Sequence, residues 1–198
     1  MAPLSTAPPV VARDTASQIL DVAERLVQTR GFNDFSYADV ATELGVSKPS
    51  LHYHFASKAA LGDALIARYS TRFLAELDRI EAQSSDPRTR LEGYAELYGA
   101  VLAAGRMCLC GMLAAEYQTL PPTMRAAVLE FFERNEAWLE RVLADSRPTT
   151  RALNPESTRD AARMIIDTLE GAVMISRAQN DVDRFARVAA RLIITTIG

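Results

Sequence analysis

Apolar residues recur at helical spacing along almost the whole chain, and short groups of Gly, Pro, Asn and Ser separate the periodic segments. Side chains three and four residues apart lie on one stripe of an α-helix, whereas the strict alternation typical of strands is almost absent. The sequence therefore predicts an all-α protein. With 198 residues, 48% of them hydrophobic and 24% charged, the helices can enclose one or two small cores.

The composition favours neither a membrane protein nor a metalloprotein. Apolar runs such as residues 100–104 are far shorter than the roughly 18 residues that a membrane span needs. Residues 1–14 are rich in proline and lack the basic and apolar regions of a signal peptide, so we expect a flexible arm and a cytoplasmic protein. Cys108 and Cys110 lack the partners of a zinc site and cannot build a disulfide framework, so we expect no metal and no cofactor.

Three helices are expected in the first quarter of the chain. The first covers residues 15–30 and ends at Gly31. The second is about two turns long and ends with Gly45; Ser36 caps it, with Asp39 completing an acidic capping box. A third helix is capped by Ser47 and carries Pro49 in its first turn, with a buried stripe formed by residues 51 and 55.

The stretch "LGVSKPSLHYHFASKAAL" holds both histidines and both lysines of the chain. A metal pair is disfavoured, because two residues apart on a helix His52 and His54 point about 200° apart. A solvated turn without function is the plain alternative. Contact with an anion is the third, and it must rest on local placement, because the chain has a net charge of -3.

Two short helices joined by a turn that contains Gly are typical of a helix-turn-helix, whose second helix presents its N-terminal residues to the major groove of DNA. Lys48, Ser50 and His52 would then read bases or phosphates. Lys58 follows Ser57, the expected cap of a long helix over residues 58–83, and its charge opposes the positive end of the helix dipole. A phosphate bound at this helix start would remove the conflict.

The segment "FSYADVATELGVSKPSLHYHFASKAAL" resembles the DNA-binding head of the TetR family of bacterial transcriptional regulators, and the resemblance covers residues 15–69. It implies contacts to bases by Lys48, Pro49, Ser50 and His52. It also implies contacts to the DNA backbone by Tyr53, His54, Lys58, Ser36 and Tyr37. One departure is His52, which stands where the family commonly has Tyr.

Residues 88–198 read as a second helical unit, which in the resembled family holds a small-molecule pocket that controls the head. Aromatic and Met side chains supply candidate linings, although at helical spacing such residues are more often plain core. Glu116 is either a polar handle for the ligand or a charge on a solvated helix face. The candidate ligand residues are Tyr94, Tyr98, Cys108, Met112, Tyr117, Phe131, Trp138 and Met174.

The last two helices carry apolar residues on more than one face. The first of them is expected to begin with Asn154 as cap and Pro155 at its first position. A helix that is apolar on two sides needs two partners, and in so small a chain a second copy is the economical one. We therefore predict a homodimer through these helices, and from their apolar stripes we expect Asp at Val173 or Leu192 to give monomers. The second apolar face comprises Met164, Thr168, Gly171 and Ile175 on one helix and Ala186, Ala190, Ile194 and Ile197 on the other.

The sequence thus predicts a flexible arm at residues 1–14, a helix-turn-helix domain at 15–57, and a linking helix with an effector-binding and dimerisation domain at 58–198. As function we expect a repressor that is released from an inverted-repeat operator in double-stranded DNA by a small apolar or electrophilic effector. Three alternatives stay open: an activator on the same fold, a helix-turn-helix that serves only protein partners, and an enzyme with a nucleophilic cysteine. The enzyme would lack a histidine outside the head to serve as base, although Glu116 is a possible substitute.

Overall fold

The computed structural model describes residues 14–145 and 155–197, and over these ranges the chain forms α-helices and one short 3-10 helix but no strand. The all-α prediction is confirmed. Residues 1–13 of the expected arm and the expected cap Asn154 lie outside the described residues. The elements are α1 (Thr15–Arg30), α2 (Tyr37–Leu44), α3 (Lys48–His54), α4 (Lys58–Gln83), α5 (Pro87–Ala103), α6 (Leu109–Ala115), η1 (Tyr117–Thr119), α7 (Pro122–Ala144), α8 (Pro155–Ala178) and α9 (Val182–Ile197).

Local capping signals set the helix bounds in the head, which comprises α1 to α3. Ser36 and Asp39 form the predicted capping box, and Gly45 closes α2 in the left-handed conformation with φ 66°. Ser47 occupies the cap position of α3, but its side chain accepts no hydrogen bond from the helix. The sequence predicted Phe55 on the buried stripe of α3, which was wrong: Phe55 is the half-buried C-cap residue, and Leu51 is the one buried residue of α3.

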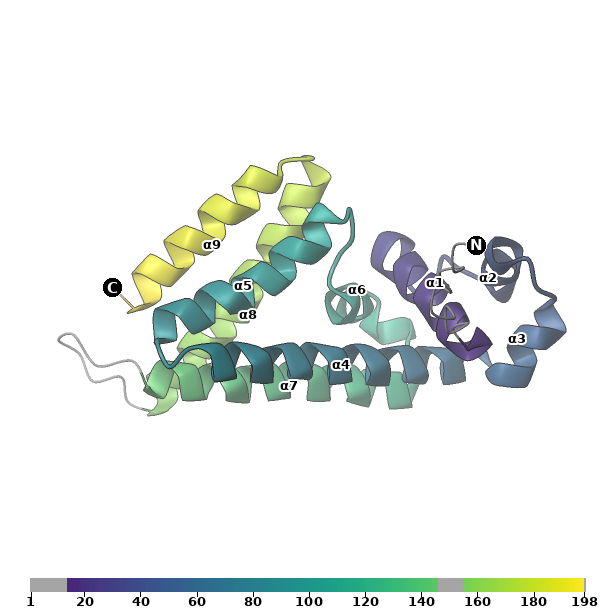
Figure 1. Ribbon diagram of the computed structural model, residues 1–198, viewed down its shortest axis with the longest axis horizontal. Coiled ribbons are helices and arrows are strands. Elements are labelled where there is room, and N and C mark those ends of the chain that lie inside the picture. The colour runs from purple at the N-terminus through teal and green to yellow at the C-terminus, as the bar shows by residue number, and fades with distance from the viewer. Residues whose placement is uncertain (1–13, 146–154, 198) are drawn as a thin grey trace, which may run out of the picture.

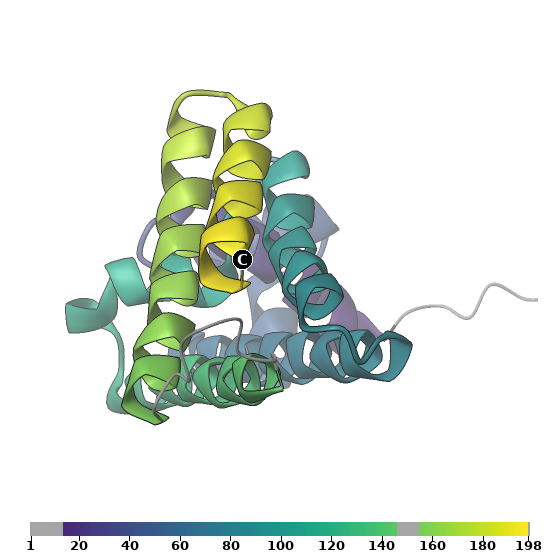
Figure 2. The same cartoon turned by 90° about the vertical axis from the view of Figure 1, so that its left-hand side faces the viewer.

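The long helix α4 joins the head to the rest of the molecule and lies side by side with α7 (Figures 1 and 2). The head packs at one end of α4, and an ion-pair network fixes α1 to it: Arg68 donates to Asp21 at 2.8 Å and to Glu24 at 2.9 Å, and Arg72 also binds Glu24. Because Glu24 is buried, its carboxylate has lost the hydration that water would supply, and the two guanidinium groups compensate for that loss. The head is therefore held against α4 by ion pairs as well as by packing.

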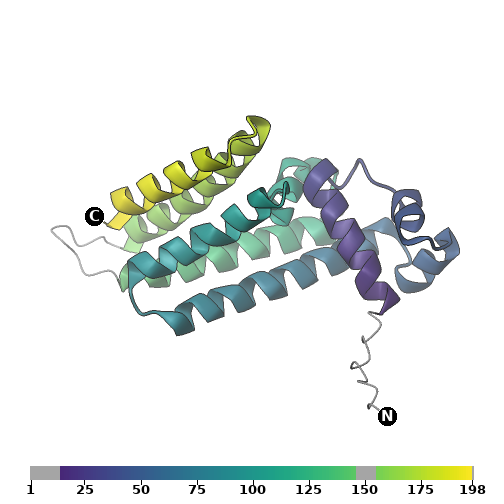
Figure 3. The same cartoon turned by 45° about the horizontal axis from the view of Figure 1, so that its top comes forward.

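The helices α8 and α9 form an outer layer that runs over α5 and α7 (Figures 2 and 3). As predicted, each has two apolar faces, and only one of them is buried within the chain. Val173 and Leu192 lie on that buried face, so aspartate there would disrupt the fold of the single chain; the choice of these two positions to produce monomers was wrong. The other face remains open, with Met164 50%, Ile175 42% and Ile194 47% exposed.

No helix in the described ranges combines the length and the apolar character that crossing a membrane requires.

Candidate nucleic-acid interface and ligand site

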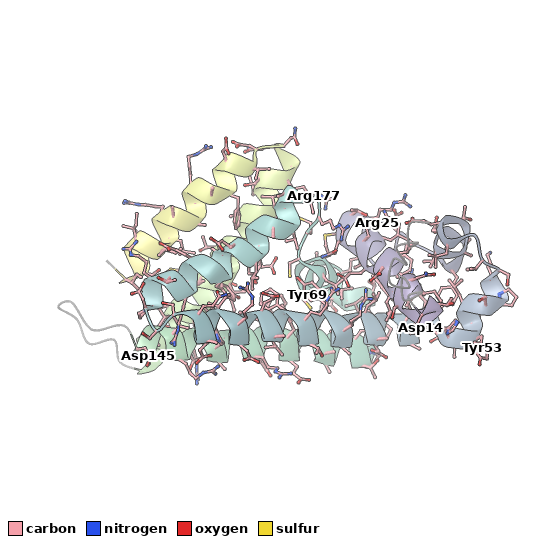
Figure 4. The ribbon with its side chains drawn as sticks, viewed as in Figure 1. Asp14, Arg25, Tyr53, Tyr69, Asp145 and Arg177 are labelled. Carbon is pink, nitrogen blue, oxygen red and sulfur yellow. The ribbon has the colours of Figure 1, made fainter. Side chains whose placement is uncertain are left out.

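The helix α3 lies at the tip of the head, where its outer side is open to solvent. Lys48, Pro49 and His52 are exposed, while Ser50 and His54 are partly covered. Tyr53 is 86% exposed and lies at the end of the molecule, away from the body (Figure 4). A residue as apolar as tyrosine is rarely left this open without a partner, and its ring and hydroxyl suit contacts with a sugar-phosphate backbone.

Tyr37 braces α2 against α3. Its hydroxyl donates to the carbonyl oxygen of Phe55 at 2.9 Å, and its ring centroid lies 4.7 Å from that of His52. The Nδ1 atom of His52 lies 3.3 Å from the carbonyl oxygen of Ala56. With its proton on Nδ1, His52 donates there and keeps Nε2 as an outward acceptor. Tyr37 thus positions the imidazole, a role that the sequence did not suggest.

Ser36 is exposed at the start of α2, but its polar groups are engaged with the helix. Its hydroxyl donates to the carboxylate of Asp39 at 2.6 Å, and its backbone N–H donates to the same oxygen at 2.7 Å. These two hydrogen bonds lower the pKa of Asp39.

Lys58 is the lysine that does not face solvent freely. Its ammonium group lies 4.7 Å from the ring centroid of Phe32 and 4.5 Å from that of Phe35, and it is partly buried. Burial lowers its pKa, against which the carboxylates of Glu116, Asp39 and Asp34 act. Lys58 is therefore not part of the exposed set on α3. Its cation-π contacts with Phe32 and Phe35 offset the unfavourable interaction of its charge with the positive end of the α4 dipole.

Four of the eight candidate ligand residues come together in the core between α4, α5 and α7. Tyr94 stacks on Trp138 with centroids 5.6 Å apart, and it contacts Tyr98 at 5.5 Å between centroids. The Tyr94 hydroxyl donates to Asn135 Oδ1 at 3.1 Å and lies 3.2 Å from the Tyr98 hydroxyl. We call the buried rings that meet here the aromatic cluster: Tyr69, Phe73, Tyr94, Tyr98, Phe131 and Trp138.

Cys108 adjoins this cluster from the start of α6. The Tyr69 hydroxyl donates to its sulfur at 3.5 Å, and the backbone N–H of Gly111 donates to the same sulfur at 3.4 Å. Burial raises the pKa of the Cys108 thiol well above its ordinary value, and the nearby Glu170 carboxyl raises it further. This thiol is therefore protonated at neutral pH.

The remaining candidates are not brought into the cluster. Met112 packs on the edge of the core, and Tyr117 lies on η1 beneath the guanidinium group of Arg125, 5.8 Å from its ring centroid. Met174 is 51% exposed on the open face of α8. Among the described residues, no three His, Cys, Asp or Glu side chains are grouped so as to hold a metal ion.

Sequence reasoning missed the junction between the head and the core. Glu116, which follows α6, accepts hydrogen bonds from the backbone N–H of Phe32 at 2.5 Å and of Asn33 at 3.2 Å, so it is neither a solvated charge nor part of the cluster. Gly31 makes room for this carboxylate, since its φ is 97° and a Cβ there would meet it.

Arg177 of α8 closes the junction from the other side (Figure 4), donating to the carbonyl oxygens at the end of α1. The distances are 3.2 Å to Gln28 and 2.8 Å to Thr29. A cation at a helix C-terminus interacts favourably with the dipole, but its sequence position gave no sign of the partner.

Comparison with known proteins agrees with this architecture. Residues 19–65 match the bacterial regulatory proteins of the tetR family, and residues 101–191 match the C-terminal domain of LmrA/YxaF-like transcriptional regulators. A TetR transcriptional regulator from Legionella pneumophila superposes with a TM-score of 0.86 at 32% identity, covering 96% of this chain and 100% of that one. A TetR-family regulator from Agrobacterium tumefaciens gives 0.85 at 29% identity, covering 92% and 97%.

The similarity extends to a curated regulator. The transcriptional regulator AcuR of Cereibacter sphaeroides is 27% identical over 176 residues, which are 84% of this chain and 79% of AcuR. The match of the head, the match of the C-terminal unit and the superposition of nearly the whole chain point to one family. The chain belongs to the TetR family of bacterial transcriptional regulators.

Proposed function

We propose that this DNA-binding regulator is a homodimeric repressor that leaves an inverted-repeat operator when a small molecule enters the core of its C-terminal domain. The observation that supports coupling is the position of α6. Its N-cap residue, Cys108, contacts the aromatic cluster, and its C-cap residue, Glu116, accepts hydrogen bonds from the backbone of residues 32 and 33 after α1. A ligand that shifts α6 would thus change the conformation of the head.

The DNA-contacting residues are, in this proposal, the exposed set on α3 together with the start of α2. Lys48, Ser50 and His52 read base edges, while Tyr53 and His54 contact phosphates. Pro49 sits in the first turn of α3, where it contacts the groove without removing a helix hydrogen bond. Ser36 and Tyr37 add contacts to the DNA backbone from α2, and Lys58 adds long-range charge. The protein acts in the cytoplasm, where the operator is.

The effector class is narrowed by the state of Cys108. An electrophile needs the thiolate, and burial raises the thiol pKa, so we favour an effector that binds without a covalent bond. The same burial weighs against an enzyme that uses Cys108 or Cys110 as nucleophile, since both pKa values are raised.

The direct test is selection of bound fragments from the source genome, followed by binding at several salt concentrations. We expect an inverted repeat to be enriched and the affinity to fall steeply with salt, because Lys and Arg displace counterions from phosphates. Binding without sequence enrichment, or without salt dependence, would contradict the proposal and favour the helix-turn-helix that serves protein partners.

A further inference from the structure

Glu170 places a carboxyl group against the core of the C-terminal domain. It lies on α8 and reaches across to α6, where Gly111 leaves it room; a Cβ at that position would clash with the carboxyl. Besides burial, the carboxyl raises the pKa of the Cys108 thiol, which lies three residues before Gly111. Its Oε1 atom is buried and has no hydrogen-bond partner, and no basic side chain of the described residues pairs with the group. An unpaired polar atom of this kind is costly and calls for a function.

The carboxyl adjoins Gly111 beside the Cys108 end of the aromatic cluster: the backbone N–H of Gly111 and the hydroxyl of Tyr69 both donate to the Cys108 sulfur. The charge of the carboxyl contributes to raising the pKa values of Tyr69 on α4 and of Tyr94 and Tyr98 on α5, in each case after the larger effect of burial. Tyr69 lies in the middle of the molecule, beside α6 (Figure 4). The faces of aromatic rings carry partial negative charge, so rings and carboxyl favour the same kind of ligand. An anion would be repelled by both.

We propose that Glu170 and the aromatic cluster form the effector site and that the effector is an organic cation, an ammonium group on an apolar or aromatic body. This inference rests on the proposed function, because it names the chemical class of the molecule that releases the regulator from DNA. The ammonium N–H groups donate to the free Oε1, the ring faces surround the charge, and the apolar body replaces ring-to-ring contacts in the cluster.

A route to the site begins at the surface between α4 and α7. A groove of about 270 Å³ lies there, and Phe131 belongs both to its lining and to the aromatic cluster. Phe131 therefore separates the groove from the cluster. The charged side chains of the groove are Asp63, Glu130 and Arg134, two acids against one base, which also favours the approach of a cation.

The protonation state of Glu170 sets a pH dependence. Burial raises its pKa to about 7. Below that pH the carboxyl is neutral, so binding a cation must release its proton and is weakened; above that pH it is strengthened. The other titratable groups that face it have raised pKa values and remain neutral below about pH 9: Tyr69 on α4, Tyr94 and Tyr98 on α5, and Cys108 and Cys110 on α6.

The chain contains its own reporter, since Trp138 is its one tryptophan and stacks within the cluster. Three probes share the same phenylalkyl group and differ in their polar end: 4-phenylbutylammonium, 4-phenylbutanol and 4-phenylbutyrate. Each is titrated against the intact protein while Trp138 fluorescence is followed. We expect the ammonium compound to bind most tightly and the carboxylate most weakly. Its affinity should fall about tenfold from pH 8.5 to pH 6.0, as expected for one group of pKa near 7. Equal binding of the three probes would overturn the proposal without any variant.

Glu170→Gln keeps the size of the side chain and removes the charge. We expect it to weaken binding of the ammonium probe about tenfold or more, to leave the alcohol within about twofold, and to abolish the pH dependence. Glu133→Gln, on the exposed side of α7, is the matched control and should bind like the native protein. An ammonium preference that survives Glu170→Gln would refute the role of this carboxyl.

DNA binding is measured separately, so the two proposals can fail independently. If the protein selects an inverted repeat but shows no preference for the ammonium probe, the inference fails and the regulator stands. If the ammonium probe binds through Glu170 but no DNA is selected, the site stands and the proposed function fails.

Discussion

The two lysines of the chain are ten residues apart and occupy different environments. Lys48 is exposed at the start of α3, whereas Lys58 lies against Phe32 and Phe35. We expect Lys48→Ala and His52→Ala each to lower affinity for the operator by about 1–3 kcal/mol relative to random duplex. Lys58→Ala should weaken both duplexes alike and also lower the free energy of unfolding by ~1 kcal/mol. Binding to operator and random duplex, with urea unfolding, distinguishes them; equal losses on both duplexes for all three variants would contradict the division.

Glu170 should also affect stability, whatever the ligand. Its pKa is about 7 in the folded protein against 4.5 for an ordinary glutamate, so the folded state holds its proton over a range in which the unfolded state loses it. The penalty is absent below pH 4.5, grows as the pH rises, and is complete above about pH 7, reaching about 3 kcal/mol. Glu170→Gln should therefore stabilise the protein at pH 8 and not at pH 4. Urea unfolding at both values measures this, and a constant difference would mean that the carboxyl is solvated.

Cys108 gives a prediction about oxidants. Because burial keeps its thiol protonated, we expect Cys108→Ser and the native protein to respond alike to hydrogen peroxide and to reactive aldehydes. The measurement is retention on the selected operator fragment after brief exposure. Release of the native protein alone, with the serine variant still bound, would contradict this prediction and support an electrophilic effector that reacts with Cys108.

At the scale of elements, α6 matters because it is short and held at both ends. We expect Glu116→Ala and Arg177→Ala each to leave the aromatic cluster intact but to loosen the end of α1, because each removes charge-assisted hydrogen bonds worth about 1.5–3 kcal/mol. Hydrogen exchange should then rise in the backbone of residues 28–35, while α7 keeps its protection. Glu130→Ala, on the surface of α7, is the control that matches the charge change of Glu116→Ala. Unchanged exchange at residues 28–35 would show that the junction does not depend on these side chains.

What the sequence could predict at this scale follows from the range of the interactions. The bounds of α1, α2 and α4 were predicted correctly because their signals are local, such as the capping box of Ser36 and Asp39 and the cap at Ser57. The junction was missed because the carboxylate of Glu116 meets Phe32 across 84 positions of the chain. Glu170 was missed for the same reason: its helix reads as apolar, and only the fold places α6 against it.

For the whole molecule, the open face of α8 and α9 predicts the state of association. Ile175→Asp or Ile194→Asp should give monomers that keep their helix content, because both side chains are exposed in the single chain and would be desolvated only in the dimer. Val173→Asp should unfold the protein instead, since Val173 is fully buried. Sedimentation at micromolar concentration and circular dichroism separate these outcomes. A native protein that sediments as a monomer would remove the reason for an inverted-repeat operator.

The contacts between the head and the C-terminal domain limit which heads can be exchanged into this regulator. A head exchanged with that of a relative would carry its own DNA specificity, but the groups that hold it, Glu116 and Arg177, would stay behind in the recipient. The incoming segment must therefore present a glycine at the position of Gly31 and free backbone groups at the end of its first helix. A hybrid biosensor built from this chain should be joined so that these contacts are rebuilt. Otherwise the new head can bind DNA, but ligand binding will not release it.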